Sequence, residues 1–194
     1  METVLILDFG AQYSQLIARR VREQNVYCEV KPCSISPAEI EKIAPIGIIL
    51  SGGPQSVYES VSLRVDPALF ALGIPVLGIC YGCQLMAYSL GGTVAAATEA
   101  TAREYGKTLT EFDTHSAIFQ DLPASSVTWM SHGDYMAKVP EGFTLCAHSA
   151  ACPTVGICDE ERGFYGVQFH PEVNHTVYGS EMLHNFLYEI CGAV

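Results

Sequence analysis

Basic residues are scarce in this chain. Its 194 residues include ten lysines and arginines against twenty-one aspartates and glutamates, which gives a formal net charge of −11. Domains that bind the phosphate backbone of nucleic acids usually carry a basic patch. We therefore expect no nucleic-acid partner, and we expect a basic patch on any protein that docks against this acidic chain.

Long apolar runs are also missing, because Gly and Pro interrupt every hydrophobic stretch. None approaches the roughly 18 apolar residues that a membrane-spanning helix needs. The first residues, METVLILDFGAQ, have an acidic second residue and a strand-length apolar run, unlike a signal peptide. We therefore expect a soluble, cytoplasmic protein without a membrane partner. The length suits one domain with a sizeable core.

The eight cysteines form neither paired C-x-x-C sets nor a Cys/His zinc pattern. In a chain of this size without a secretory signal, cysteines are expected to stay reduced. Most should be buried as small hydrophobic side chains. We expect no structural metal.

Short apolar runs in the first half predict strands at 4–9, 47–52 and 75–80. They are continuous rather than alternating, which is typical of strands covered on both faces in a parallel sheet. Helical patterns at 11–25 and 82–92 separate them, and the second stops at a Gly pair. Strands that alternate with helices predict an α/β fold with right-handed crossovers.

The second half has a different pattern. It predicts short strands at 104–110 and 126–131, two strands around a charged turn within 154–169, and a helix over 180–192 capped by Ser180. We find no repeat or linker. The sequence thus predicts a single domain over 1–194, with an open, mostly parallel sheet flanked by helices and additional antiparallel strands in its second half.

The stretch GICYGC at 78–83 permits three interpretations of Cys80. A cysteine at a strand end is often a core residue, whereas Cys80 and Cys83 also form a C-x-x-C pair at a helix start, as in redox proteins. Alternatively, Gly78-x-Cys80-x-Gly82 is the cysteine form of the nucleophile elbow, a sharp strand-to-helix turn. The helix N-terminus would then favour the thiolate, and the Tyr81 N–H would be an oxyanion donor.

A thiolate nucleophile also needs a base. Of six histidines, His170 is the best candidate because it follows the apolar run YGVQF and precedes Pro171. It should therefore lie at the carboxyl edge of the sheet, where sites of α/β folds form. Glu172 lies two residues further on and could fix the tautomer of the imidazole, as in a catalytic triad. Cys80, His170 and Glu172 make a complete set of nucleophile, base and orienting carboxylate.

GICYGCQ and FHPE (169–172) together resemble the signature of the triad-type, or class I, glutamine amidotransferases. Further motifs extend the resemblance along the whole chain: ILDFGAQYSQLIARRVRE, IILSGGPQSVYE, REYG, WMSHGD and GVQFHPEVNHT. These motifs are similar in particular to the glutaminase domains of GMP synthetases. The resemblance implies a flavodoxin-like class I amidotransferase fold.

The resemblance also implies a role for each matching residue. Cys80 would attack the side-chain amide of glutamine to form a thioester, His170 would protonate the leaving ammonia and then activate water, and Glu172 would polarise His170. The backbone N–H groups of Gly53 and Tyr81 would bind the oxyanion, although SGGP also fits an ordinary turn. Residues that would bind the two charged ends of glutamine are Gln84, Ser131, His132, Gly133 and Asp134, although a solvated loop also fits SHGD.

In GMP synthetases the ammonia is used by an ATP pyrophosphatase domain that adenylates xanthosine monophosphate (XMP). The S-G-G-x-D-S motif of that domain is absent here, so we expect the synthetase on another domain or subunit. The resemblance implies no cofactor for glutamine hydrolysis, with ATP and Mg²⁺ needed only by the synthetase.

One position departs from the family pattern, because Cys83 stands where a Met is usual. Its thiol could fill a gap in the core, or it could form an oxidised pair with Cys80 that silences the enzyme. Two other functions stay open. The chain could be a cysteine hydrolase of the same architecture, such as a deglycase or peptidase relative, or a regulatory domain that binds a partner without turnover.

Overall fold

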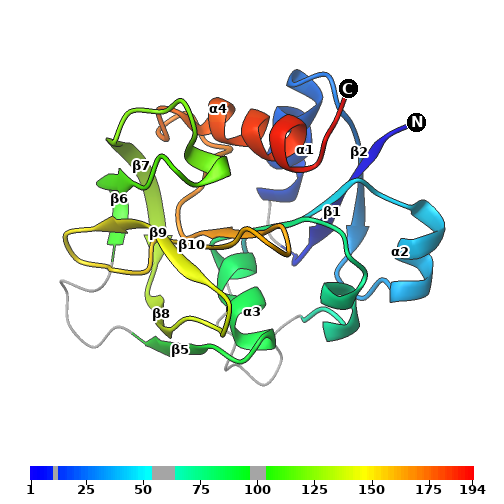
Figure 1. Ribbon diagram of the computed structural model, residues 1–194, viewed down its shortest axis with the longest axis horizontal. Coiled ribbons are helices and arrows are strands. Elements are labelled where there is room, and N and C mark those ends of the chain that lie inside the picture. Colours follow the sequence, from blue (N-terminus) through cyan, green and yellow to red (C-terminus); the bar gives the residue numbers. More distant parts are fainter. Residues whose placement is uncertain (11–12, 54–63, 97–103) are drawn as a thin grey trace.

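A nine-stranded sheet forms the centre of the computed structural model, which describes residues 1–10, 13–53, 64–96 and 104–194 (Figure 1). The strand order is β2-β1-β3-β4-β11-β10-β9-β6-β7. The first five strands in this order, which are β2, β1, β3, β4 and β11, pair with one another in parallel. The remaining strands, β10, β9, β6 and β7, add to the sheet by antiparallel pairing. The predicted mostly parallel α/β sheet with antiparallel additions is therefore confirmed.

The parallel strands are β1 (Thr3–Asp8), β2 (Tyr27–Pro32), β3 (Gly47–Leu50), β4 (Val76–Ile79) and β11 (Phe164–Val167). The antiparallel strands are β6 (Glu104–Phe112), β7 (Ser125–His132), β9 (Thr144–Ser149) and β10 (Gly156–Asp159). A separate antiparallel pair consists of β5 (Thr93–Ala96) and β8 (Asp134–Lys138).

The α-helices are α1 (Tyr13–Glu23), α2 (Pro37–Ile43), α3 (Tyr81–Ser89) and α4 (Gly179–His184), which continues as the π-helical turn η4 (Asn185–Ile190). The described residues also form short 3-10 helices at η1 (Pro67–Ala71) and η3 (Ala117–Phe119). No helix in the described ranges is both long enough and apolar enough to cross a lipid bilayer.

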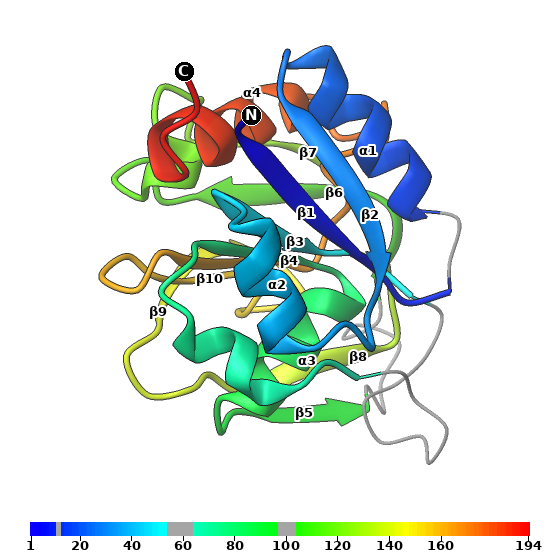
Figure 2. The same ribbon diagram turned by 90° about the vertical axis from the view of Figure 1, so that its right-hand side faces the viewer.

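Helices cover both faces of the parallel strands. Figure 2 shows α1 and α4 on one side of the sheet and α2 and α3 on the other. Along β1, Val4 and Ile6 belong to the same core cluster as Ile17 of α1, whereas Leu5 and Leu7 belong to the cluster of Ile40 in α2. Both sets of side chains are buried, which explains why the predicted strands are apolar without alternation.

The predicted elements of the first half correspond to β1, β3, β4, α1 and α3, with boundaries shifted by at most three residues where the structure describes them. Positions 11–12 of the first predicted helix lie outside the described residues. The charged turn predicted at 159–163 joins β10 to β11, and Gly163 has a φ of 74° that favours glycine.

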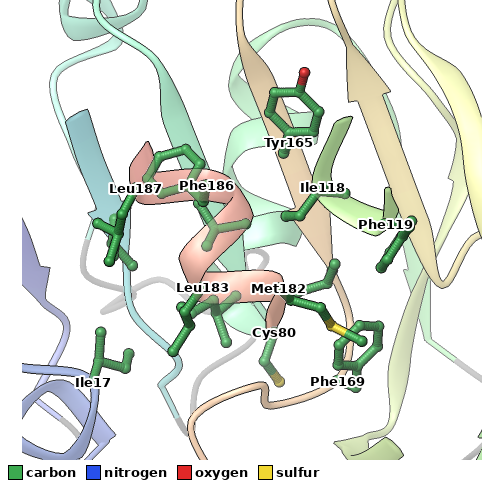
Figure 3. Close-up of a cluster of buried hydrophobic side chains, with 14 of the residues drawn as sticks. Ile17, Cys80, Ile118, Phe119, Tyr165, Phe169, Met182, Leu183, Phe186 and Leu187 are labelled. Atoms are coloured by element: carbon green, nitrogen blue, oxygen red, sulfur yellow. The ribbon is translucent and has the colours of Figure 1, made fainter. Parts of the chain in front are cut away.

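The predicted capping role of Ser180 is wrong. Tyr178 is the N-cap of α4 and makes no side-chain cap bond, whereas Ser180 is already the second helical residue. The carbonyl oxygen of Ser180 instead accepts a hydrogen bond from Nε2 of Gln24 at 3.2 Å. The apolar stripe of this helix is core as predicted, and Figure 3 shows its side chains with Ile17, Phe169 and Cys80. Gly192 follows its C-cap with a φ of 75°.

Candidate active site

Cys80 occupies a sharp turn between β4 and α3. Its φ of 53° and ψ of −111° lie in a region that residues with a side chain rarely adopt. Its N–H donates to the carbonyl of Val167 in β11, with an N···O distance of 2.8 Å. The strained backbone is therefore tied to the neighbouring strand.

The two glycines that flank Cys80 allow this turn to pack. A Cβ on Gly78 would lie 2.7 Å from the carbonyl oxygen of Gly82, and a Cβ on Gly82 would lie 2.2 Å from that of Leu50. Real Cβ atoms do not approach backbone atoms so closely. The spacing Gly-x-Cys-x-Gly is thus required by the contact of α3 with the ends of β3 and β4, as in a nucleophile elbow.

The thiol of Cys80 is placed at the start of α3 and is 5% exposed. The positive end of the helix dipole at this terminus favours an anion, such as a thiolate. The Sγ lies 3.6 Å from the carbonyl oxygen of Ser131 at the end of β7. Figure 3 shows Cys80 at one edge of a core cluster beneath α4.

Cys83 belongs to a different core cluster from Cys80. It is fully buried, its Sγ lies 3.7 Å from the Sδ of Met136, and it packs over Gly166 of β11. Burial raises the pKa of this thiol well above its ordinary value, which keeps it protonated and unreactive. All eight cysteines are free thiols. The structure thus favours the gap-filling interpretation of Cys83 over the redox pair.

His170 and Glu172 form a buried pair beyond the end of β11. The distance from Nδ1 of His170 to Oε2 of Glu172 is 2.9 Å, and their exposures are 1% and 0%. Burial disfavours the charged imidazole, but hydrogen bonds to Cys80 and Glu172 and the negative charge of both outweigh it. The pKa of His170 therefore rises from 6.5 to about 11. The structure brings the three predicted catalytic residues together.

Backbone contacts to β7 fix the position of His170. Its N–H donates to the carbonyl of Trp129 at 3.0 Å, and its own carbonyl accepts the hydroxyl of Thr176 at 2.6 Å. The same hydroxyl oxygen accepts the N–H of Trp129 at 2.9 Å. Thr176 therefore joins the segment that carries His170 to the outermost strand of the antiparallel half.

Helix α1 also contacts the pair. The ring of Tyr13 stacks on the imidazole of His170, with centroids 4.6 Å apart and an interplanar angle of 27°. The guanidinium of Arg20 donates to the carbonyl of Glu172 at 2.8 Å and to Oδ1 of Asn174 at 2.9 Å. The sequence motifs gave no sign of a role for Tyr13, Arg20 or Thr176, although all three lie within QYSQLIARRVRE and PEVNHT.

Gly52 and Gly53 follow β3 and border the same site. The Cβ position of Gly52 is 3.0 Å from Cε1 of His170 and 3.8 Å from Cβ of Cys80. The Cβ position of Gly53 is 3.5 Å from the ring of Tyr81. The two predicted oxyanion donors, Gly53 and Tyr81, thus lie close together at the nucleophile, and their role stays a prediction.

The predicted glutamine-binding residues gather between α3 and the β7–β8 connection. Gln84 is 4% exposed and its Nε2 donates to the carbonyl of Asp134 at 3.2 Å. Ser131 and His132 end β7, Gly133 forms the bend, and Asp134 begins β8. The side chain of His132 lies outside the described part of the structure. Their contacts with glutamine stay predictions.

Within the residues described, no three His, Cys, Asp or Glu side chains gather as metal ligands would. The site holds the thiol of Cys80, the imidazole of His170 and the carboxylate of Glu172. A nucleophile, a base and an orienting acid in this arrangement can catalyse acyl transfer.

Sequence similarity shows which acyl-transfer enzymes the chain is related to. The family model for class-I glutamine amidotransferases matches residues 5–190. The chain belongs to this family. Its sequence is 54% identical over 190 residues to the glutamine-hydrolysing GMP synthase of Bacillus pumilus, and 52% identical over 191 residues to that of Geobacillus kaustophilus. These matches cover 98% of this chain but only 36% and 37% of the two relatives.

Solved structures agree with this family and its fold. A Thermoplasma acidophilum protein assigned as a component of GMP synthase is 33% identical, with a TM-score of 0.84, over 98% of this chain and 94% of that one. A glutamine amidotransferase from Thermotoga maritima shares the fold, with a TM-score of 0.79 at 20% identity over 99% of both chains. The predicted class I amidotransferase fold is confirmed.

Proposed function

We propose that this chain hydrolyses glutamine to glutamate and ammonia, and that the ammonia aminates XMP to GMP on a synthetase domain or subunit. The observation that carries the first part is the buried triad on a strained elbow, in a chain of the glutamine amidotransferase family. The second part is supported by relatives named GMP synthase that share half or more of the residues of this chain.

The first half-reaction forms a thioester. The thiolate of Cys80 attacks the side-chain amide carbon of glutamine, and the amide oxygen becomes an oxyanion. Backbone N–H groups of Tyr81 and Gly53 stabilise this negative charge. The imidazolium of His170 gives its proton to the amide nitrogen, and ammonia leaves as the thioester carbonyl re-forms.

The second half-reaction restores the thiolate. His170, now neutral, takes a proton from water, and the resulting hydroxide attacks the thioester carbonyl. The carbon–sulfur bond then breaks, Cys80 leaves as the thiolate beside the protonated His170, and the new carboxyl group gives its proton to water as glutamate departs. Glu172 holds Nδ1 of the imidazole throughout, so that the other ring nitrogen faces the sulfur. Gln84 and residues 131–134 bind the α-amino and carboxylate ends of glutamine in this scheme.

The proposed glutaminase reaction uses protein groups and water only. ATP and Mg²⁺ act in the synthetase part, which adenylates XMP before ammonia attacks it. We place the reaction in the cytoplasm, which agrees with eight cysteines that are all free thiols.

A covalent label tests the glutaminase site directly. The reduced protein is treated with a glutamine-like chloroketone, and the adduct is located by intact mass and peptide mapping. We expect one adduct on Cys80 that excess glutamine suppresses. Cys80→Ala should abolish it, whereas the control Cys191→Ala should not, because burial raises the pKa of that thiol to about 12. Scattered labelling without protection by glutamine would contradict the proposal.

A reconstitution tests the GMP assignment. The synthetase part of the Bacillus pumilus GMP synthase is added with ATP, Mg²⁺ and XMP, and GMP is measured with glutamine as the only nitrogen source. Formation of GMP that requires Cys80 supports the assignment. Hydrolysis of peptides in preference to glutamine would favour the cysteine-hydrolase alternative, and binding of the synthetase without any reaction with chloroketone would favour a regulatory domain.

A further inference from the structure

Helix α1 approaches the buried His170–Glu172 pair with two side chains. Tyr13 and Arg20 are seven residues apart, which is close to two helical turns, so they project from the same side of the helix. Tyr13 contacts the imidazole of His170, and Arg20 contacts the carbonyl of Glu172. One helix face therefore reaches both members of the pair, from a part of the chain about 150 residues away.

The imidazole of His170 has little freedom between its neighbours. Tyr13 covers one face of the ring, Glu172 holds Nδ1, and a Cβ on Gly52 would lie only 3.0 Å from Cε1. The Cβ position of Gly52 is also 3.6 Å from the ring of Tyr13 and 3.8 Å from Cβ of Cys80. A side chain at position 52 would therefore contact His170, Tyr13 and Cys80 together.

Because charged groups surround the His170 ring, the Tyr13 contact affects the charge state of the ring as well as its position. The titratable groups in contact with the His170 imidazole are Cys80 at the start of α3, Glu172 beyond β11, and the phenol of Tyr13 on α1. Arg20 contacts Glu172 at its backbone carbonyl, and its guanidinium is paired with Glu23 at 3.0 Å. An aromatic face against a cationic ring stabilises the cation, and the effect grows when water is excluded.

We propose that Tyr13 is a positioning residue for the glutaminase reaction, which holds the His170 ring toward Cys80 and stabilises its charged form. The inference rests on the proposed function, because the charged imidazole is the acid that protonates the leaving ammonia. Arg20, on the same face of α1, fixes the backbone of Glu172 and so completes the support of the pair. The phenol hydroxyl is not needed for this role, since the contact is made by the ring.

Substitutions at Tyr13 separate positioning from folding. Tyr13→Phe keeps the ring and should keep kcat within about twofold, whereas Tyr13→Leu should lower kcat about tenfold with little change in KM. The matched control is Tyr27→Leu, which removes a half-exposed tyrosine from β2 and should change neither constant. Thermal unfolding of each variant shows whether the protein is folded at the assay temperature.

Two further measurements do not depend on turnover. The first is the rate of Cys80 alkylation at a fixed pH, which should fall in Tyr13→Leu because a Cys80 thiolate loses part of its counter-charge. The second is NMR titration of His170 in histidine-labelled protein. The ratio of charged to neutral imidazole at a given pH should fall about tenfold in Tyr13→Leu and stay near the wild-type value in Tyr13→Phe.

The outcomes are distinct. A folded Tyr13→Leu variant with wild-type kcat and an unchanged His170 titration overturns the inference. So does a variant whose lower activity follows only from lower thermal stability, with an unchanged titration. If the wild-type protein neither hydrolyses glutamine nor labels at Cys80, the proposed function fails instead, and the titration still shows whether Tyr13 stabilises the charged imidazole.

Discussion

Gly52→Ala should damage catalysis more than stability. The new Cβ would lie 3.0 Å from Cε1 of His170, which is closer than nine in ten real Cβ contacts. Its other near neighbours, Tyr13 and Cys80, are at ordinary contact distances of 3.6 and 3.8 Å. Gly52 does not have a positive φ, so alanine adds no backbone strain. The imidazole alone has to move, by a few tenths of an ångström.

The ring cannot make this shift freely. Glu172 holds Nδ1 at 2.9 Å and Tyr13 covers a face, so the movement lengthens the hydrogen bond or opens the stack. A misplacement of about 1 Å can cost about a hundredfold in rate, so a few tenths should cost about tenfold in kcat. The crowding itself should lower the free energy of unfolding by about 1 kcal/mol, the low end for overpacking.

The assay is steady-state release of glutamate, with the free energy of unfolding measured in urea. The control is Gly73→Ala, because nothing lies within 4 Å of its Cβ position but its φ is +77°. It should lose about 1 kcal/mol of stability through backbone strain and keep the wild-type kcat. A Gly52→Ala variant with unchanged kcat would show that the imidazole has more room than its contacts indicate.

Three other substitutions test the site. Glu172→Gln should lower kcat by about 10² to 10⁴ and lower the pKa of His170. Because that pKa is raised to about 11 in the wild type, the wild-type free energy of unfolding should fall as the pH rises from 6.5 to 11. The variant should show a flatter dependence of this free energy on pH in urea titrations. Gly82→Ala should cost about 3 kcal/mol or more by the same measurement, and a cost near 1 kcal/mol would mean that the elbow can open. Cys83→Ser should lose activity in peroxide at the wild-type rate, because Cys83 packs against Met136 in the core. Slower loss of activity in this variant would support the hypothesis that Cys83 and Cys80 form an oxidised pair.

The parallel strands could be predicted from sequence because both of their faces are buried. Elements whose side chains are partly buried and partly exposed were harder to predict from sequence. Strand β2 is an edge strand whose first residue, Tyr27, is 47% exposed, and its polar residues hide the pattern. Helix α2 has only seven residues, but Ser36 caps it and bonds the N–H of Glu39. The pattern S-x-x-E before an apolar residue was a signal that could have revealed this helix.

The triad could be predicted because each member lies in a local motif with a chemical reason. The elbow needs its glycines on both sides of Cys80, and Glu172 follows His170 by two residues. Tyr13 and Arg20 act through contacts between segments far apart in the chain, so their spacing in sequence says nothing about the site. Ser180 was misassigned because serine favours caps in general, whereas the true boundary is set by the packing of α4.

The pairing of β4 with β11 also governs when the site can exist during synthesis. Ile79, next to the nucleophile, pairs with Val167, so the two halves of the site meet across nearly half of the chain. Contacts between such distant segments form late, because the intervening chain has to close first. A nascent chain that has emerged only as far as β10 carries Cys80 but neither His170 nor Glu172. Under the proposed function, an incomplete chain hydrolyses no glutamine, because Cys80 has no base until residues 164–172 have been added beyond β10.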